Sequence, residues 1–381
     1  MSNIFGGDAY SPIKISSSEI DSYKKTHPEI QVIDSYNELL EELFLLRNPK
    51  HRFDKNFALP LKEFVNSFGV LKNHGNWFYF PWINSIIHFL PEEMHFEMRT
   101  GRNKNLITKE EQEKYYNSRV GILGMSVGSH VAMTLAMTGG AKNIKIADPD
   151  TLSGSNLNRI RTGYHNIGVS KVHIVARDIY LINPYANVKI YTQGLTKENM
   201  EEFLTGGGNL NCLVEEMDNP FLKLKVREYT KKLGIPVVMA ADNSDSIITD
   251  VERYDLKKST KILNGVIGSM KAEDFLDATP QEIPGMIAKI AGANIAAVRM
   301  LHSVVEVGKT LYSWPQLGTA ANLCGSVLSY LTRKIILGEK NIKSGRFEVN
   351  LNSIFEADYF SAKQKAYRKK EITKFLKGGK K

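Results

Sequence analysis

Short apolar runs alternate with longer segments of helical periodicity between residues 96 and 260. The runs predict strands at residues 119–123, 143–148, 187–191, 212–217 and 236–240. The segments between and after them predict helices at residues 129–138, 169–182, 197–204 and 220–233. Because strands alternate with helices, the pattern predicts an α/β fold, in which helices cover both faces of a doubly wound, mostly parallel sheet.

The segments on either side of this region show different patterns. Residues 1–95 contain a helical pattern at 37–46 and an aromatic run at 77–80, and we interpret them as a small α/β cap or an arm on the next domain. They suggest no chemistry of their own. Residues 261–360 are expected to form a C-terminal helical or α+β part. Its predicted elements are helices at 285–307 and 318–337 and a strand at 346–351.

Positive charge is concentrated at the C-terminal end of the chain. The formal net charge is +9, and residues 363–381 alone hold nine Lys or Arg and one Glu, which leaves the rest near neutral (9 − 8 = +1). We interpret residues 361–381 as a solvated basic tail, and contact with RNA, DNA or an acidic protein remains open. Without an apolar stretch of about 18 residues, a secretory signal or a disulfide framework, the chain is expected to be a cytoplasmic protein that makes no membrane contact.

The turn after the first strand of the alternating region has the composition of a nucleotide site. Gly124, Ser126 and Gly128 are small residues between a predicted strand and a predicted helix, so backbone N–H groups there can approach a phosphate. Asp148 follows the next strand, about 20 residues further on, where a carboxylate can accept hydrogen bonds from ribose hydroxyls. An NAD(P)-dependent oxidoreductase would share these features.

Further blocks of residues follow this carboxylate in a fixed order. They are Asp148-Pro149-Asp150, Ser155-Asn156-Leu157-Asn158-Arg159, Gly168-Val169-Ser170-Lys171 and Asp218-Asn219. With these blocks, residues 95–260 resemble the ThiF/MoeB/HesA family, the adenylating superfamily that includes ubiquitin-activating enzymes, and a weaker match resumes at 315–320. The resemblance implies a Rossmann-like ThiF-type adenylation domain over residues 96–360, with its nucleotide core at 118–260. It also implies an ATP-dependent adenylyltransferase, which forms an acyl-AMP from a carboxylate and releases pyrophosphate.

The resemblance also implies roles for the charged residues. A carboxylate attacks an anionic phosphate poorly, so such a site needs cations that neutralise the phosphates and hold the reactants in line. By resemblance, Asp148 would bind the ribose and Asp150 would shape the same loop. Asn156 and Arg159 would contact the phosphates, and Lys171 would bind the β- and γ-phosphates or the departing pyrophosphate.

Two further expectations concern the metal and the oligomer. Asp218 is expected to hold Mg²⁺, since a carboxylate oxygen beside phosphates is a suitable ligand. In the family, an arginine from an N-terminal segment often reaches the partner subunit's site. The matching segment here contains Arg99 and Arg102, so the resemblance implies a homodimer in which one of them contacts the nucleotide.

The chain departs from the family pattern at two points. Serine replaces glycine at the third and sixth positions of the G-x-G-x-x-G turn, at Ser126 and Ser129. The two pairs of C-x-x-C cysteines that hold a structural zinc in many members are missing, so we expect no such zinc site. Cys212 and Cys324 are interpreted as core residues rather than thioester nucleophiles.

Several substrates and functions remain open. The leading interpretation is activation of the C-terminus of a ubiquitin-like or sulfur-carrier protein, or of a peptide. A tRNA-modifying enzyme of the same superfamily, which would activate a carboxylate on a modified base, is the close alternative. An NAD(P)-dependent oxidoreductase has no need of Arg159, Lys171 and Asp218, and a non-catalytic nucleotide-binding module would not need to retain Asp218.

Overall fold

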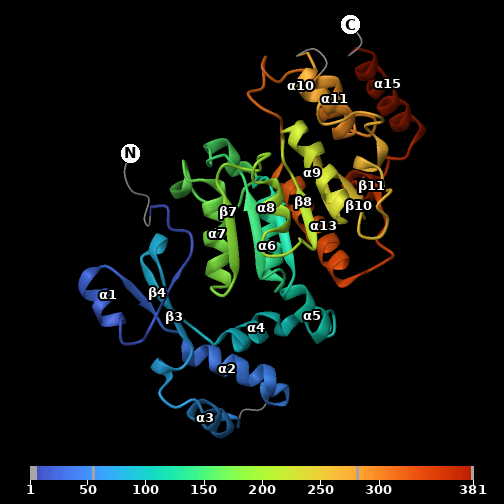
Figure 1. The fold of residues 1–381 in the computed structure, drawn as a ribbon. Helices are drawn as coiled ribbons and strands as arrows, with labels where there is room; N and C mark the ends of the chain where they lie inside the picture. Colours follow the sequence, from blue (N-terminus) through green and yellow to red (C-terminus); the bar gives the residue numbers. More distant parts are fainter. Residues whose placement is uncertain (1–6, 54–55, 280–282, 379–381) are drawn as a thin grey trace. The chain divides into compact units, whose positions relative to one another are not determined.

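The computed structural model describes residues 7–53, 56–279 and 283–378 (Figure 1). The chain divides into two compact units. The first unit comprises residues 1–117, 135–142 and 173–188, and the second comprises 118–134, 143–172 and 189–381. No helix in the described ranges is both long and apolar enough to span a bilayer.

The first unit contains a four-stranded sheet in the order β1-β3-β4-β2. Its strands are β1 (Ile13–Ile15), β2 (Gln31–Ile33), β3 (Asn76–Phe80) and β4 (Ser85–Phe89), and its helices are α1 (Ile20–Thr26), α2 (Tyr36–Arg47), α3 (Ala58–Asn66), α4 (Glu92–Thr100) and α5 (Lys109–Tyr116). The predicted aromatic run is strand β3, which pairs with both β1 and β4. Trp77 stacks on His88 of β4 at a ring distance of 3.9 Å, so aromatic packing fills this small core.

A seven-stranded sheet, in the order β11-β10-β9-β8-β5-β6-β7, lies mainly in the second unit. Its strands are β5 (Arg119–Leu123), β6 (Asn143–Ala147), β7 (Asn187–Tyr191), β8 (Cys212–Glu215), β9 (Val237–Asn243), β10 (Ser246–Glu252) and β11 (Gly345–Val349). Strand β5 pairs in parallel with β6 and β8, and β8 with β9. The α/β fold expected from the alternating pattern is therefore confirmed.

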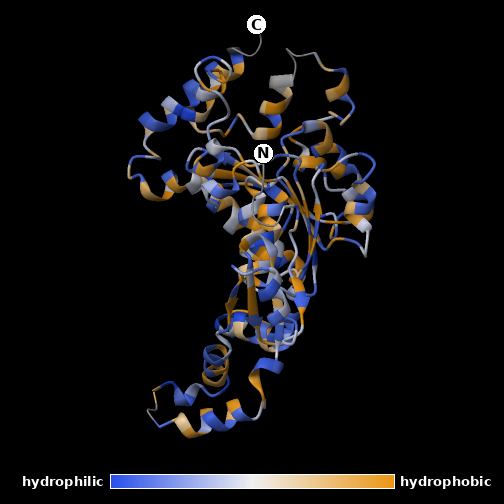
Figure 2. Ribbon diagram, turned by 90° about the vertical axis from the view of Figure 1, so that its left-hand side faces the viewer, coloured by the Kyte–Doolittle hydropathy of each residue, from blue (hydrophilic) through white to orange (hydrophobic). Residues whose placement is uncertain are grey.

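Helices connect these strands where the periodicity predicts them. They are α6 (Gly128–Met137), α7 (Lys171–Ile182), α8 (Met200–Thr205), α9 (Pro220–Leu233) and α13 (Gly318–Leu337). Helix α9 has clear sequence signals at both ends, because the Asn219 side chain accepts the Leu222 N–H and Gly234 adopts the left-handed conformation. Hydrophobic residues (orange in Figure 2) concentrate on the strands, whereas the helices carry both colours, as expected for helices that cover a sheet.

The pattern does not predict strand β10, which forms an antiparallel hairpin with β9. Every residue of β10 is buried, yet its sequence contains Asp250 and Glu252, so it does not stand out as an apolar run. Both carboxylates are neutralised inside the protein, Asp250 by Arg346 and Glu252 by Arg227. Buried charges of this kind are tolerated when they are paired, and the pairing partners are distant in sequence.

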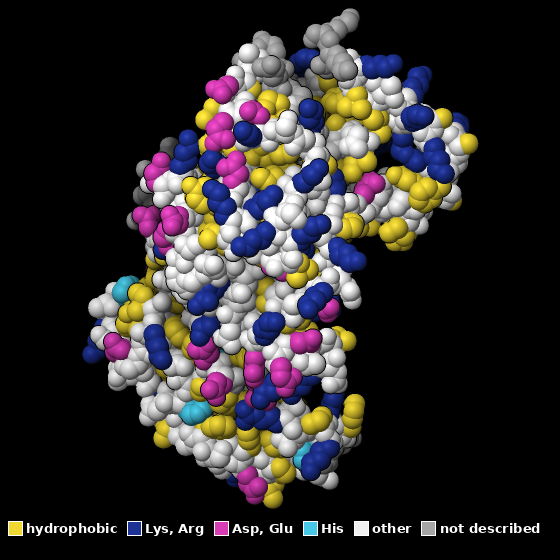
Figure 3. Space-filling model, turned by 45° about the vertical axis from the view of Figure 1, so that its right-hand side comes forward, with side chains coloured by type: hydrophobic (Ala, Val, Ile, Leu, Met, Phe, Trp, Pro, Cys, Tyr) yellow, Lys and Arg dark blue, Asp and Glu magenta, His cyan; other side chains and the backbone are white. Residues whose placement is uncertain are grey.

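The C-terminal part contains α10 (Asp274–Asp277), α11 (Ile283–Ala291), α12 (Val298–Val304), α14 (Leu351–Phe355) and α15 (Ala362–Gly378). The single helix predicted at 285–307 is wrong: Gly292 has a φ of +80°, and α11 and α12 are separate helices. The basic segment is largely helical, since α15 spans most of it, and His302 of α12 contacts Glu371 of α15. Basic side chains (dark blue in Figure 3) are nevertheless spread widely over the face that the figure shows, well beyond any single segment.

Candidate active site

The turn between β5 and α6 is held by close backbone packing. Gly124 has a φ of +85°, and a Cβ there would lie 2.4 Å from the carbonyl oxygen of Glu216, which follows β8. A Cβ on Gly128 would lie 2.8 Å from the Ile122 side chain. The two glycines are therefore required by geometry, and they keep the start of α6 close to the carboxyl ends of the parallel strands.

Gly124→Ala should consequently be more destabilising than an alanine at another left-handed glycine. Gly308 is the matched control, because its φ is +80° and nothing lies within 4 Å of its missing Cβ. Left-handed strain alone is expected to cost Gly308→Ala about 1–2 kcal/mol. Gly124→Ala must also displace the backbone at Glu216, so urea unfolding should show a larger loss. Equal losses in the two variants would contradict this account of the turn.

Asp148 lies directly after β6 and is bound to the turn. Its Oδ2 accepts the Met125 N–H at 2.6 Å, and its Oδ1 accepts the Asp150 N–H at 2.8 Å. The residue is only 5% exposed. Burial raises the pKa of Asp148, although Lys171 and the two backbone N–H groups oppose this effect. The carboxylate thus sits at the turn and is held there by two backbone donors.

Lys171 begins α7 and faces the same carboxylates. Its Nζ lies 2.8 Å from an oxygen of Asp150 and 4.0 Å from an oxygen of Asp148. The residue is only 8% exposed, so its ammonium group is held in one place. The predicted Asp148, Asp150 and Lys171 therefore come together in the structure as a compact charged cluster.

Arg159 contacts the turn directly. Its Nε donates to the Ser126 hydroxyl at 3.0 Å, and its Nη1 donates to the Asn158 side chain at 2.9 Å. Burial lowers the pKa of Arg159, and the nearby carboxylates Asp242 and Asp218 oppose this shift. The guanidinium group therefore lies in the field of two acids and within reach of the predicted phosphate turn.

Asn156 and Asp218 occupy loops beside this cluster. The Asn156 side chain accepts the Ser153 N–H at 3.0 Å, which shapes the short 3₁₀ helix Gly154–Asn158 that leads to Arg159. Asp218 is exposed in the loop between β8 and α9, next to the helix-capping Asn219. Within the described ranges, no group of three or more His, Cys, Asp or Glu side chains is arranged to hold a metal ion. Mg²⁺ at phosphates often takes only one or two protein carboxylates, and the donor chemistry of Asp218 fits that mode.

The ThiF family profile matches residues 100–372, which is well over half of the chain. The chain belongs to the ThiF family. A Mycobacterium tuberculosis protein described as uncharacterized is 34% identical over 287 residues, 75% of this chain but only 39% of that protein. Bacillus subtilis tRNA threonylcarbamoyladenosine dehydratase is 29% identical over 52% of this chain and 82% of its own length. The adenylyltransferase and sulfurtransferase UBA4 of Vanderwaltozyma polyspora is 29% identical over 35% of this chain and 30% of its own length.

This ThiF-family chain carries a half-buried acid at the site, Asp242, that the sequence analysis missed. Asp242 lies in β9, which is next to β8 in the sheet. Its Oδ2 accepts the Gln316 Nε2–H at 2.9 Å, and the Cys324 thiol approaches its Oδ1 at 3.4 Å. Burial raises the pKa of Asp242. The signal available in the sequence was an acid close behind the predicted strand at 236–240, the same signal that identifies Asp148.

The two cysteines are buried, as the sequence analysis expected. Burial raises the pKa of Cys212 to about 12, and burial together with Asp242 raises the pKa of Cys324. The thiolate form that a nucleophile requires is therefore disfavoured at both positions.

The two candidate arginines lie in the first unit and differ in their surroundings. Arg99 donates its Nη1–H to the Ala136 carbonyl at 2.7 Å, near the C-terminal end of α6. A cation there complements the helix dipole, so the Arg99 side chain has a structural role. Arg102 is exposed in the short 3₁₀ helix Gly101–Asn103.

Proposed function

We propose that this chain is an ATP-dependent adenylyltransferase that activates a carboxylate as an acyl-AMP. The proposal rests on one observation. The buried Lys171 and the half-buried Arg159 both lie at the small-residue turn, at the carboxyl ends of β5 and β6. Hydride transfer needs no such pair of cations, whereas displacement at a triphosphate does. Family membership and the adenylyltransferase among the relatives support the same conclusion.

In this proposal the residues act mainly by placing charge. Asp148 would accept hydrogen bonds from the ribose hydroxyls while it keeps its bonds to the turn. Lys171 would exchange its contact with Asp150 for the β- and γ-phosphates, and Arg159 would contact the phosphates beside Ser126. Mg²⁺ held by Asp218 would neutralise phosphate charge. The substrate carboxylate is already ionised at neutral pH, so the site needs no general base.

For the carboxylate we propose the C-terminus of a ubiquitin-like or sulfur-carrier protein, or of a peptide. The relative named adenylyltransferase and sulfurtransferase supports this class. A carboxylate on a modified tRNA base is the second candidate, and the match to a tRNA threonylcarbamoyladenosine dehydratase over most of that protein's length favours it. We also propose a cytoplasmic location.

Exchange of labelled pyrophosphate into ATP tests the proposal and separates the substrates. Exchange should appear only when the correct carboxylate is supplied, from a panel of ubiquitin-like proteins, peptides and a modified tRNA. Binding of reduced dinucleotide, measured in parallel by fluorescence, addresses the oxidoreductase alternative. ATP binding without exchange for any member of the panel would instead favour a non-catalytic nucleotide-binding module.

Asp218→Ala is expected to abolish Mg²⁺-dependent exchange while ATP binding persists. The Asp218 side chain is exposed and caps no helix, so the fold should survive its removal. Calorimetric titration with ATP, with and without Mg²⁺, measures the two properties separately. Asp245→Ala is a suitable control, because this carboxylate, in the turn between β9 and β10, contacts Thr319 and has no proposed metal role. Normal exchange in Asp218→Ala would contradict the role assigned to Asp218.

We further propose a homodimer in which Arg102 of each subunit contacts the nucleotide of the other. Arg102→Ala and Lys171→Ala homodimers should then both be impaired. After subunit exchange, half of the dimers are mixed and each has one intact site, so about a quarter of the wild-type activity should return. No recovery on mixing would show that Arg102 acts within its own subunit or has no role at the site.

A further inference from the structure

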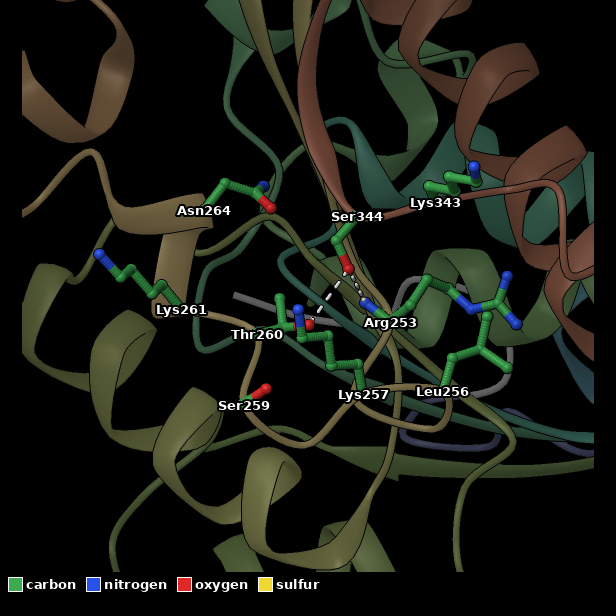
Figure 4. Close-up of a pocket in the computed structure, with 9 residues that line it drawn as sticks. All are labelled: Arg253, Leu256, Lys257, Ser259, Thr260, Lys261, Asn264, Lys343 and Ser344. Atoms are coloured by element: carbon green, nitrogen blue, oxygen red, sulfur yellow. Dashed lines mark hydrogen bonds between the residues drawn. The ribbon is translucent and has the colours of Figure 1, made fainter.

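A cavity of about 490 Å³ lies in the second unit, away from the residues discussed so far (Figure 4). It is lined by Arg253, Leu256, Lys257, Ser259, Thr260, Lys261, Asn264, Lys343 and Ser344. The volume falls within the range of small-molecule sites. The lining is dominated by cations, hydroxyls and an amide, and it includes no acidic residue.

The strand register places this cavity at the opposite ends of the parallel strands from the candidate active site. Glu252, at the end of β10, pairs with Val237 at the start of β9, and Arg253 follows directly. The candidate active site lies at the other ends of the parallel strands. Strand β9 spans Val237–Asn243, so its two ends are about 20 Å apart at a rise of ~3.3 Å per residue. The cavity is therefore not part of the nucleotide site.

Three lysines without ion-pair partners among the described residues line the cavity. Lys257, Lys261 and Lys343 are exposed, and the structure gives none of them an ion pair in its described ranges. Arg253 differs, because its guanidinium group is bound to Asp255 and to the carbonyls of Glu339 and Ile342. Arginine's planar fork, which suits carboxylates, is thus occupied, whereas the lysine ammonium groups act as point charges.

Hydroxyl groups complete the polar lining. The Ser344 hydroxyl accepts the Arg253 N–H at 2.9 Å and lies 3.4 Å from the Thr260 hydroxyl. In Figure 4 the ammonium group of Lys257 points toward Thr260 and Ser344, whereas those of Lys261 and Lys343 point away from these hydroxyls. An anion with several acceptor oxygens would meet the Lys257 ammonium group and a pair of hydroxyls, one of which can donate to it while the other donates within the pair.

We propose that this cavity binds the phosphate group of a small phosphorylated molecule. Lys257 neutralises the phosphate charge, the Thr260 and Ser344 hydroxyls contact the phosphate oxygens, and the remaining volume accommodates the rest of the ligand, with Lys261 and Lys343 at the rim. This site is independent of the proposed adenylation, since it shares no residue with the nucleotide site.

Titration calorimetry of the full chain with glycerol 2-phosphate tests the proposal. Lys257→Ala should weaken binding about tenfold, as loss of one charge-assisted contact does, and Lys343→Ala, whose ammonium group points away from the hydroxyl pair, should weaken it less. Lys258→Ala and Lys340→Ala are matched controls, because these lysines are neighbours in sequence and do not line the cavity. Their affinities should equal that of the wild type. Lys171→Ala should also bind normally, which separates this site from the nucleotide site.

Five outcomes would overturn the proposal. The first is the absence of saturable binding, and the second is an equal loss in the variants and their matched controls, which indicates diffuse attraction. The third is a loss confined to Lys171→Ala, which places the probe in the nucleotide site. The fourth is malate binding as tightly as the phosphate, which would show a general anion site. The fifth is Lys257-dependent binding of a tRNA transcript alone, which would show an RNA contact.

Discussion

Lys171→Ala is expected to slow pyrophosphate exchange at least about 100-fold, the size of effect seen when a charge contact to a transition state is removed. Lys171 is the buried cation nearest to Asp148 and Asp150. Without it, two carboxylates would face the triphosphate with no ammonium group between them. Part of the loss should therefore appear as weaker ATP binding and part as slower chemistry.

The pH dependence of this variant provides a second measurement. Lys171 opposes the effect of burial on the pKa of Asp148, so its removal should raise that pKa further. A carboxylate with a higher pKa becomes protonated at a higher pH, so the acidic limb of the pH–activity profile should shift to higher pH. Lys171→Arg keeps the charge and should keep the limb in place. An unchanged limb in Lys171→Ala would show that Lys171 does not control the ionisation of Asp148.

The sequence predicts elements best where local signals agree with burial. Strand β5 and helix α9 begin and end where expected, because an apolar run defines the first and Asn219, Pro220 and Gly234 define the second. The prediction at 285–307 fails for the opposite reason. Its apolar periodicity continues across Gly292, whose left-handed conformation separates α11 from α12, and periodicity alone does not reveal that break.

Long-range pairing accounts for what the sequence did not reveal. Strand β10 escapes prediction because Asp250 and Glu252 are acceptable inside the protein only with partners that come from other elements. Asp242 was missed since its importance depends on Arg159 and Gln316, which are distant in sequence. Asp148 was found because the turn that binds it precedes it at a characteristic spacing. The charged cluster was thus predictable where one motif contains it, and unpredictable where the fold assembles it.

Arg227 links the fold of the second unit to the loop that carries Asp218. Arg227 is fully buried in α9, donates its Nε–H to Glu252 at 2.7 Å and also pairs with Glu215 at the end of β8. Lys223 binds the same Glu215 at 2.8 Å, so two cations and two carboxylates balance. The network fixes α9 against β8 and β10, and the loop between β8 and α9 contains Asp218.

Arg227→Met is expected to destabilise the protein by about 3–5 kcal/mol, because it leaves Glu252 buried without its cation. The midpoint of urea unfolding, followed by circular dichroism, measures this loss. Lys225→Ala is the matched control on the same helix. Lys225 pairs with Glu228 and Glu273 near the surface, so its loss should cost at most about 1 kcal/mol. Similar losses in the two variants would contradict the importance given to the buried network.

The destabilisation caused by Arg227→Met should also depend on pH. Burial tends to raise the pKa of Glu215, but Lys223 and Arg227 outweigh it and hold that pKa below its ordinary value. A carboxylate with a lowered pKa in the folded state stabilises the fold above its unfolded pKa, near 4.3, and loses this contribution as the pH falls through the folded value. The wild type therefore loses stability in acid. Arg227→Met loses less, because the contact between Arg227 and Glu215 is already missing. The difference between their unfolding free energies should shrink below about pH 4, and a constant difference would mean that Arg227 acts through packing rather than charge.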